Sequence, residues 1–244
     1  MTNYKKNLNS IIIFSDFDAT ITEKDLTDEI FKLFGNYEHY LSQLKEKKIT
    51  IFEYWKEFCK ALPLDFFGES LNQFIAKQGI DYYFSNFLSF CNTNNFPFTI
   101  ITDNFAEIVN PFLTHFNLNN LRVFSNKIIF QENKYIPVFP FANENCEECI
   151  SAVCKRNIIL SQLPEDAIVV YIGDGFSDSC AANYCDIIFA KDYLASYCSE
   201  NRIPHFNYKS FFEVKKILEK LLNSNKLRNR YQAQLNRKRA YEIE

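Results

Sequence analysis

The stretch of residues 11–22, which reads IIIFSDFDATIT, decides the fold of this 244-residue chain. Five apolar or small residues stand before the first acid, without a polar–apolar alternation. Such a run, rich in β-branched residues and ended by acids, is typical of a strand buried on both faces of a parallel sheet. Open α/β sheets bind their ligands at the carboxyl ends of the strands. The sequence therefore predicts a functional site directly after residue 15.

Two aspartates, Asp16 and Asp18, stand at that predicted strand end. Alternate residues of an extended chain point the same way, so both carboxylates could address one bound group. Close carboxylates repel each other unless a cation or a proton relieves the repulsion. This pair favours a divalent metal ion beside a reactive acid. The alternative is a solvated strand end, because short acid pairs are common.

Three further apolar runs, at 96–101, 167–172 and 186–190, read as buried strands. Helical spacing between the runs predicts a doubly wound, mainly parallel α/β sheet with right-handed crossovers. The carboxyl ends of parallel strands meet at one edge of the sheet. The polar residues expected to converge there are Asp16, Asp18, Thr102, Asp174 and Asp178.

The segment 22–84 carries no convincing strand and has the spacing of about four short helices, punctuated by Gly and Pro. A helical block inserted directly after the first strand predicts a cap over the site. Its aromatic stripe is interpreted as the core of the cap rather than as a ligand cage. We therefore expect a catalytic core at 1–21 and 85–225 and a helical cap at 22–84. The polar, basic tail at 226–244 is interpreted as a solvated terminal helix.

Local patterns add further elements to the core. Helices are expected at 84–91, 105–116, 149–160 and 211–222, and a β-hairpin is expected from 127–130 and 135–139. The helix at 149–160 contains Lys155.

Composition limits the classes of function. Apolar residues make up 47% of the chain and charged residues 23%, which excludes global disorder. A net charge of −3 gives no general attraction to nucleic acid or to an anionic membrane. No run approaches the about 20 apolar residues of a membrane span, and acids interrupt the N-terminal apolar run too early for a signal peptide. We expect a cytoplasmic monomer or homodimer without a nucleic-acid or membrane partner.

The eight cysteines are scattered through a chain with an ample core, which favours reduced thiols over a disulfide framework. Cys146, Cys149 and Cys154 could bind Zn²⁺, but a fourth ligand is not evident and the spacing is unusual. Buried or free thiols are the favoured alternative.

The predicted strand edge supplies each part that phosphoryl transfer needs. An aspartate can form an aspartyl-phosphate, and a second, protonated carboxyl can donate to the leaving oxygen and then accept a proton from water. A hydroxyl and a lysine can hold the phosphoryl oxygens, and Mg²⁺ offsets the repulsion between phosphate and acids. No Ser-His-Asp or Cys-His arrangement competes, because the three histidines lie in no matching motif.

Four segments, 16–22 (DFDATIT), 100–104 (IITDN), 154–155 (CK) and 173–178 (GDGFSD), resemble the four motifs of the haloacid dehalogenase superfamily of phosphohydrolases, in order and in spacing. The inserted helical block resembles the small cap of the phosphoserine-phosphatase-like branch. The hairpin, the cysteines after it and the FAKDYL stretch at 189–194 are similar to the methionine-salvage 2-hydroxy-3-keto-5-methylthiopentenyl-1-phosphate phosphatases and to their phosphocholine/phosphoethanolamine phosphatase relatives.

The resemblance implies a role for each motif residue. Asp16 would be nucleophile and metal ligand, and Asp18 would be general acid/base and give its backbone carbonyl to the metal. Thr102 would bind the phosphoryl group, which Lys155 would neutralise. Asp174 would ligate Mg²⁺, and Asp178 would support the metal shell or orient Lys155. The expected substrate contacts are Thr20, Glu23, Asp103 and Asn104.

Three features of the motifs carry structural expectations. Ala19 replaces the usual Gly, which should be tolerable only if the backbone there avoids positive φ. Asp103-Asn104 replaces the Gly-Gly or Asp-Gly of many members, so we expect an altered phosphate loop. Gly173 and Gly175 are two of only five glycines in the chain, which predicts a close approach or an unusual backbone conformation.

These observations together predict a Mg²⁺-dependent phosphomonoesterase that acts on a small phosphorylated metabolite through an aspartyl-phosphate. The alternatives are a phosphoacceptor signalling or interaction module without turnover, and a phosphotransferase to a second small molecule. The cap segment contains no Arg, which weakens the case for an amino-acid phosphate. An aromatic cap would suit an apolar or quaternary-ammonium tail.

Overall fold

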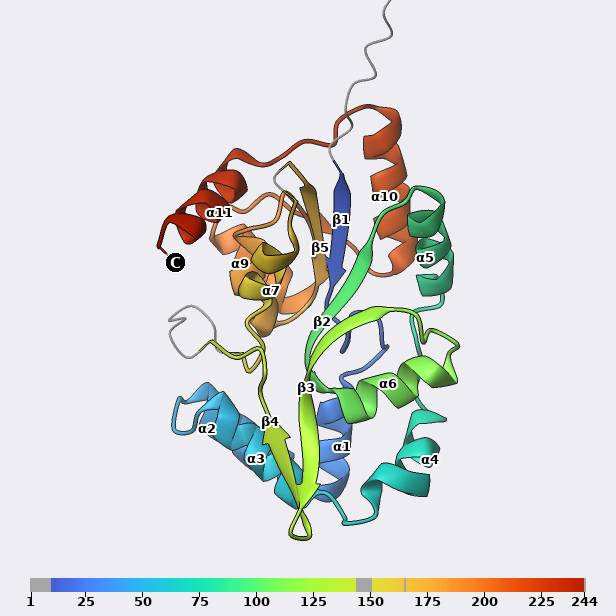
Figure 1. Ribbon diagram of the computed structural model, residues 1–244, viewed down its shortest axis with the longest axis vertical. Helices are drawn as coiled ribbons and strands as arrows, with labels where there is room; N and C mark the ends of the chain where they lie inside the picture. Colours follow the sequence, from blue (N-terminus) through green and yellow to red (C-terminus); the bar gives the residue numbers. More distant parts are fainter. Residues whose placement is uncertain (1–9, 144–150, 165, 244) are drawn as a thin grey trace, which may run out of the picture.

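A seven-stranded sheet forms the centre of the protein (Figure 1). The computed structural model describes residues 10–143, 151–164 and 166–243. The strand order is β4-β3-β2-β1-β5-β6-β7, and all neighbours are parallel except the antiparallel pair β3 and β4. The strands are β1 (Ile11–Ser15), β2 (Phe98–Phe105), β3 (Arg122–Gln131), β4 (Lys134–Val138), β5 (Ile168–Gly173), β6 (Ile187–Ala190) and β7 (Phe206–Asn207). The prediction of a doubly wound, mainly parallel α/β sheet is confirmed.

The first strand, β1, lies between β2 and β5 and is buried along its whole length. Ile11 and Ile13 enter the apolar cluster on one face of the sheet, whereas Ile12 and Phe14 enter the cluster on the other face. This double burial explains why the run has no polar alternation. It also places the residues after β1 at the centre of the carboxyl edge.

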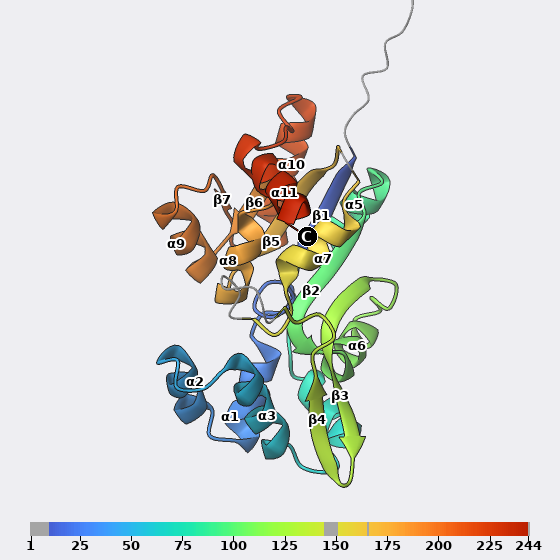
Figure 2. The same ribbon diagram turned by 60° about the vertical axis from the view of Figure 1, so that its left-hand side comes forward.

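Helices cover both faces of the sheet (Figures 1 and 2). On one face lie α5 (Phe84–Thr93), α6 (Ala106–His115) and α10 (Phe211–Asn223), and their apolar residues share a cluster with Ile11 and Ile13. On the other face lie α7 (Lys155–Gln162), α8 (Ser179–Ala182) and α9 (Asp192–Glu200), which pack on Ile12 and Phe14. The connections after β2 and β5 therefore run to opposite faces, as expected of this fold class.

The segment between β1 and α5 is helical, as predicted, and lies beyond the carboxyl end of β1 (Figure 2). It contains α1 (Leu26–Phe34), α2 (Tyr37–Lys45), α3 (Ile51–Ala61), an irregular kinked turn (Phe66–Ser70) and α4 (Leu71–Ile75). Phe31 makes ring contacts with Tyr54 and Phe58, so aromatic residues form the core of this block. Phe58 also stacks on Phe105 at the end of β2, with ring centroids 5.7 Å apart. The cap and the sheet therefore share one apolar core.

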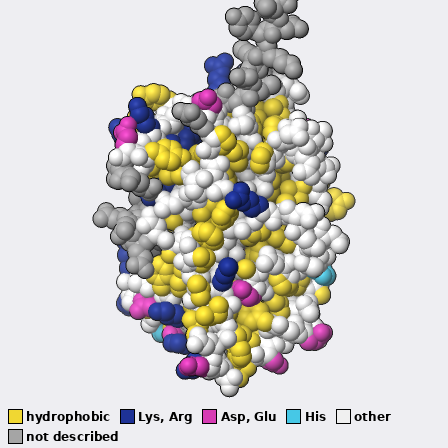
Figure 3. Space-filling model, in the orientation of Figure 1, with side chains coloured by type: hydrophobic (Ala, Val, Ile, Leu, Met, Phe, Trp, Pro, Cys, Tyr) yellow, Lys and Arg dark blue, Asp and Glu magenta, His cyan; other side chains and the backbone are white. Residues whose placement is uncertain are grey.

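The predicted hairpin is present, but its first strand is longer than expected. β3 begins at Arg122 and pairs with β2 before it pairs with β4, so the hairpin continues the main sheet. Its far end contacts the cap, because the hydroxyl of Tyr135 donates to the carbonyl of Leu64 at 2.5 Å. Apolar residues of the hairpin also reach the surface, where Figure 3 shows hydrophobic side chains gathered on this face. The exposed ones are Ile129, Phe130, Ile136 and Val138.

Three local predictions need correction. The second predicted strand does not end at Ile101: β2 continues to Phe105, with a register shift between these two residues. The Lys155 helix begins at Lys155 rather than at residue 149, which lies outside the described residues. The sequence patterns also missed α9 and β7, since neither has an apolar run long enough to stand out.

The basic tail forms a helix, α11 (Tyr231–Ile243), but the expectation that it is solvated is wrong for one of its faces. Ala233 and Arg237 are buried, and the Arg237 guanidinium donates to both carboxylate oxygens of Asp186, which lies just before β6. Arg230 donates to the backbone carbonyls of Ala182, Asn183 and Cys185. The tail therefore packs on the sheet's α7–α9 side.

None of the helices in the described part of the chain combines the length and the apolar character that a bilayer span needs. The zinc hypothesis falls partly outside the described residues, which include neither Cys146 nor Cys149. Cys154 is buried, as the alternative of buried thiols expected.

Candidate active site

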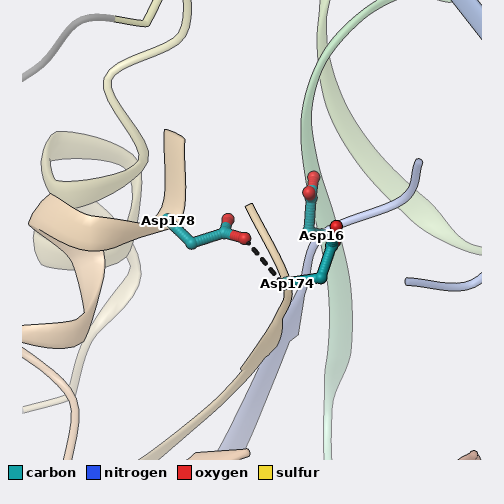
Figure 4. A group of neighbouring side chains, drawn as sticks. All are labelled: Asp16, Asp174 and Asp178. Atoms are coloured by element: carbon teal, nitrogen blue, oxygen red, sulfur yellow. Dashed lines mark hydrogen bonds between the residues drawn. The ribbon is translucent and has the colours of Figure 1, made fainter. Parts of the chain in front are cut away.

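Side chains from the carboxyl edge of the sheet and from the helical segment after β1 meet around a cavity of about 200 Å³. Asp16 and Asp18 follow β1, Thr102 lies in β2, and Asp174 follows β5. Figure 4 shows Asp16, Asp174 and Asp178 approaching one another from β1 and from the segment after β5. The predicted convergence of these residues is what the fold produces.

Lys155 is almost completely buried and bridges two of these aspartates. Its Nζ lies 2.8 Å from Oδ1 of Asp16 and 2.6 Å from Oδ1 of Asp178. Burial alone would lower the pKa of Lys155, but the nearby charges of Asp16 and Asp178 outweigh it and raise the pKa above its usual value. The lysine is therefore a permanent positive charge beside Asp16.

Asp178 uses both carboxylate oxygens for hydrogen bonds within the protein. Oδ1 accepts from Lys155 and from the hydroxyl of Tyr171, and Oδ2 accepts from the backbone N–H groups of Asp174 and Gly175. Gly173 makes room for this arrangement, since a Cβ there would lie 2.4 Å from Oδ2 of Asp178. The expected close approach is therefore found at Gly173. Neither Gly173 nor Gly175 has a positive φ.

Asp16, Asp174 and Asp178 can each place one carboxylate oxygen within 4.8 Å of the others. Among the described residues, no hydrogen bond reaches Oδ2 of Asp16 or Oδ2 of Asp174, which leaves these oxygens available to a cation. Hard oxygen donors with space for water and phosphate suit Mg²⁺. These carboxylate oxygens therefore fit Mg²⁺. Asp16 and Asp174 are the better ligands, because both oxygens of Asp178 already accept hydrogen bonds.

The other two carboxyls carry raised pKa values. Burial raises the pKa of Asp16 well above its usual range; the charge of Asp178 adds to the rise and that of Lys155 opposes it. Burial likewise raises the pKa of Asp174, to about 7, with a further rise from Asp178. A bound divalent cation would oppose both shifts.

Asp18 turns away from this group and toward the cap. Its carboxylate accepts from the backbone N–H of Leu26, from the amide of Asn104 and, at 3.3 Å, from the hydroxyl of Thr102. Burial, followed by the charge of Asp25, raises the pKa of Asp18 well above its usual range. No cation neutralises Asp18 among the described residues, so a neutral, proton-donating form is favoured.

Three predicted substrate contacts have partners inside the protein. Thr20 donates to Oδ1 of Asp174, and Asn104 donates to Asp18. Asp103 accepts from the hydroxyl of Ser151 and the backbone N–H of Val153, and so fixes the segment that leads to Lys155. Asp103 and Asn104 also line the cavity, whereas Thr20 does not.

Ala19 contradicts its expectation. Its φ is +50°, so the backbone does adopt the left-handed conformation in which Gly is normally favoured. The Thr22 hydroxyl accepts from the Ala19 N–H at 3.0 Å and supports the turn. The alanine is tolerated because surrounding contacts hold a strained residue in place.

Glu23 is exposed and does not line the cavity. The structure places Asp25 and Asp28 there instead, from the start of α1, together with Tyr54 and Trp55 from α3. Sequence reasoning missed both acids as site residues; Asp25 is the N-cap residue of α1, and Asp28 lies in its first turn. Neither Lys nor Arg is among the described residues that line the cavity.

Comparison with known proteins assigns this site to a family. The model of the family described as "Putative Phosphatase" matches residues 11–203, which include every residue of the cavity. The chain belongs to this phosphatase family. Its motifs resemble those of the haloacid dehalogenase superfamily, and its fold is the one seen in solved structures of phosphoserine phosphatase.

Individual relatives agree with that assignment. The chain is 26% identical over 214 residues to a 2-hydroxy-3-keto-5-methylthiopentenyl-1-phosphate phosphatase of Brevibacillus brevis, covering 86% of this chain and 96% of the relative. It is 28% identical over 216 residues to the protein of the same description from Bacillus cereus, covering 87% and 98%.

Solved structures of phosphoserine phosphatase share the fold. One, described as a phospho-aspartyl intermediate analogue, is 19% identical with a TM-score of 0.62, covering 86% of this chain and 99% of that chain. A substrate-bound complex is 20% identical with a TM-score of 0.61, covering 86% and 98%.

Proposed function

We propose that the protein is a Mg²⁺-dependent phosphomonoesterase that forms an aspartyl-phosphate on Asp16. The carrying observation is that Asp16 and Asp18, two residues apart, have opposite surroundings: Asp16 pairs with the Lys155 ammonium, and Asp18 receives only neutral donors. Carboxyls whose environments differ in this way are suited to separate roles, one as nucleophile and one as acid. Mg²⁺ held by Asp16 and Asp174 would supply charge neutralisation for the phosphoryl group.

Two chemical steps follow from this arrangement. A carboxylate oxygen of Asp16 attacks phosphorus, the ester P–O bond breaks, and protonated Asp18 gives its proton to the leaving oxygen. Asp18, now ionised, takes a proton from a water molecule whose oxygen attacks the phosphoryl group, which releases phosphate and free Asp16. Thr102, in the cavity wall, holds a phosphoryl oxygen in both steps, and the buried Lys155 ammonium on Asp16 offsets the negative charge beside the phosphoryl group.

The cavity wall also restricts the proposed leaving group. Asp25 and Asp28 face the cavity, and a carboxylate on the leaving group would meet them without a cationic partner. We therefore propose a small leaving group that lacks a carboxylate and bears hydroxyl or amine donors. The relatives named above act, by their descriptions, on a phosphate ester of a hydroxylated methylthio compound.

The test is phosphate release from a panel of phosphomonoesters, with Mg²⁺ and with EDTA. Phosphoserine and phosphoethanolamine are a matched pair that differs only in the carboxylate; phosphocholine, sugar phosphates and a methylthiopentenyl phosphate analogue complete the panel. We expect metal-dependent release, weakest from phosphoserine relative to its partner. Asp16→Asn should lower kcat by about 10³-fold or more, whereas Asp166→Asn, at an exposed site, should leave it unchanged.

Other results would overturn the proposal. Turnover retained in Asp16→Asn would remove the aspartyl-phosphate mechanism. A long-lived phosphoprotein without phosphate release would indicate a phosphoacceptor module. Phosphate transfer to added acceptor alcohols in preference to water would indicate a phosphotransferase.

A further inference from the structure

Tyr171 lies in the middle of β5 and is completely buried. Its ring belongs to the apolar cluster on the α7–α9 face of the sheet, together with Phe14, Ile101 and Ala181. A phenol hydroxyl buried among such residues needs a hydrogen-bond partner. The hydroxyl of Tyr171 donates to Oδ1 of Asp178 at 2.5 Å. One end of this side chain is therefore in the hydrophobic core and the other is at the base of the active site.

The accepting oxygen is the one that also holds Lys155. Oδ1 of Asp178 receives the Lys155 ammonium at 2.6 Å, and the same ammonium lies 2.8 Å from Asp16. The backbone N–H groups of Asp174 and Gly175 hold the other oxygen, Oδ2, at 3.0 and 2.9 Å. Four donors from three elements thus fix the rotation of one carboxylate, and Tyr171 supplies the donor that fixes Oδ1 from the side of the core.

The end of β5 is built around this contact. An added Cβ at Gly173 would lie 2.4 Å from Oδ2 of Asp178 and 3.0 Å from Cε1 of Tyr171. Any larger residue at this position would push the carboxylate and the ring apart. The absence of a side chain at Gly173 is thus what lets the phenol and the carboxylate meet.

We infer that Tyr171 is a positioning residue: its hydroxyl holds Asp178 in the orientation that keeps the Lys155 ammonium on Asp16. Tyr171 does not line the cavity, so it acts through Asp178 and Lys155 and does not touch the substrate. The inference rests on the proposed phosphatase function of the same site. The competing explanation is that the hydroxyl bond only stabilises the fold.

Tyr171→Phe separates the two explanations, because it removes one oxygen and keeps the ring. Loss of an outer partner of a metal ligand typically costs about 10- to 100-fold in activity, and we take the same range for this partner of Asp178. We expect kcat to fall by this factor while KM changes less than about threefold, with assays run well below the measured Tm of each variant. Replacement of Tyr171 by 4-aminophenylalanine, which keeps a donor at the ring's para position, should restore most of kcat.

Two comparisons make the result specific. Tyr241→Phe is the control for removal of a hydroxyl away from the site. The Tyr241 ring is exposed, and its hydroxyl donates to the carbonyl of Leu160 in α7, so kcat should not change. In a Lys155→Met background, Tyr171→Phe should lower kcat less than about twofold further, because Tyr171 then has no lysine to position.

Each remaining outcome contradicts the inference. A Tyr171→Phe variant with lower Tm and wild-type kcat would show a purely structural role. An equal loss of kcat with and without Lys155 would show that Tyr171 does not act through the lysine. If Tyr171→Phe does not fold, a 4-aminophenylalanine variant that folds but has kcat reduced as far as in Lys155→Met would also overturn it. If the wild-type protein releases phosphate from no phosphomonoester, both the proposed function and this role of Tyr171 are wrong. That result is seen with the wild-type protein alone, so it is distinguishable from a failure of the Tyr171 inference.

Discussion

At the scale of single residues, surroundings decide what an aspartate does. Asp16 pairs with a buried lysine, and Asp18 accepts only neutral donors. Asp103 lines the cavity, but its carboxylate accepts hydrogen bonds from the hydroxyl of Ser151 and the backbone N–H of Val153, in the segment before Lys155. Three carboxyls of one type therefore suit three roles: nucleophile, acid and structural anchor.

Ala19 gives a prediction at the same scale. An L-residue in the left-handed region costs about 1–2 kcal/mol, and Ala19 has a φ of +50°. Ala19→Gly removes that cost and adds back a smaller entropy penalty from the unfolded chain. We expect a net gain of about 0.5–1 kcal/mol in the free energy of unfolding, measured by denaturant titration.

The control for Ala19→Gly is Ala195→Gly inside α9, where the same substitution should destabilise by about 1 kcal/mol. A loss of stability in Ala19→Gly would mean that the methyl group's contacts outweigh the backbone strain.

At the scale of elements, the polar helix α11 is attached to the core by buried hydrogen bonds and an ion pair. The buried carboxylate of Asp186 accepts from the Arg237 guanidinium, and also from the backbone N–H groups of Val169 and Arg230. These bonds connect β5, the residue before β6 and the last helix. Two of the basic residues of the tail, Arg230 and Arg237, therefore have structural partners: the backbone carbonyls at 182–185 and the carboxylate of Asp186.

Arg237→Met should therefore destabilise the protein strongly. Removal of one partner of a buried ion pair leaves the other charge uncompensated, which costs about 3 kcal/mol or more. Thermal and denaturant unfolding measure the effect. Arg239→Met, on the exposed side of the same helix, should stay within about 0.5 kcal/mol of wild type. Equal effects of the two substitutions would show that α11 contributes no more than surface charge.

At the scale of the whole molecule, the cap and the sheet enclose a cavity that collects carboxyl groups. Asp25 and Asp28 come from the cap, and Asp16, Asp18 and Asp174 come from the sheet edge. The cap can hold these acids there because its own aromatic core continues into β2 through Phe105. Burial raises the pKa of these carboxyls, so the free energy of unfolding depends on pH.

Asp28 provides the clearest case. Burial, reinforced by the charge of Asp25, raises the pKa of Asp28 from 3.8 to about 7 in the folded protein. The folded state keeps the proton over a pH range where the unfolded state has lost it. The contribution of Asp28 to stability is therefore fully present below pH 4, and it is lost as pH rises toward 7.

Asp28→Asn keeps an oxygen that can accept from the Tyr37 hydroxyl, and it removes the ionisation. We expect the variant to gain Tm over wild type, and to gain more at pH 8 than at pH 5, in EDTA throughout. Each kcal/mol corresponds to about 2–4 °C for a chain of this size. Glu38→Gln, on the exposed side of α2, controls for the general pH dependence. An equal gain in Tm at both pH values would contradict the raised pKa of Asp28 in the folded protein.

The sequence predicted the elements whose residues carry strong periodic signals. The unbroken run before Asp16 predicted a strand buried on both faces, and the polar residues at the strand ends predicted which side chains would meet. Helical spacing between 22 and 84 was enough for the cap and for its aromatic core, because amphipathic periodicity is a local property. A short element such as β7 lacked that signal, and the polar tail was predicted as a helix without its buried face.

Only the tertiary structure decided the contacts between residues that lie far apart in the chain. No local pattern shows that Tyr171 supports Asp178, that Arg237 neutralises Asp186, or that Asp25 and Asp28 rather than Glu23 face the cavity. The strain at Ala19 was likewise invisible, since it persists only because neighbouring structure holds it. The sequence by itself determined which chemical groups this protein has and at which strand ends they stand. Their distances and charge states depend on burial and on partners, which exist only once the cap, the sheet and the last helix are packed together.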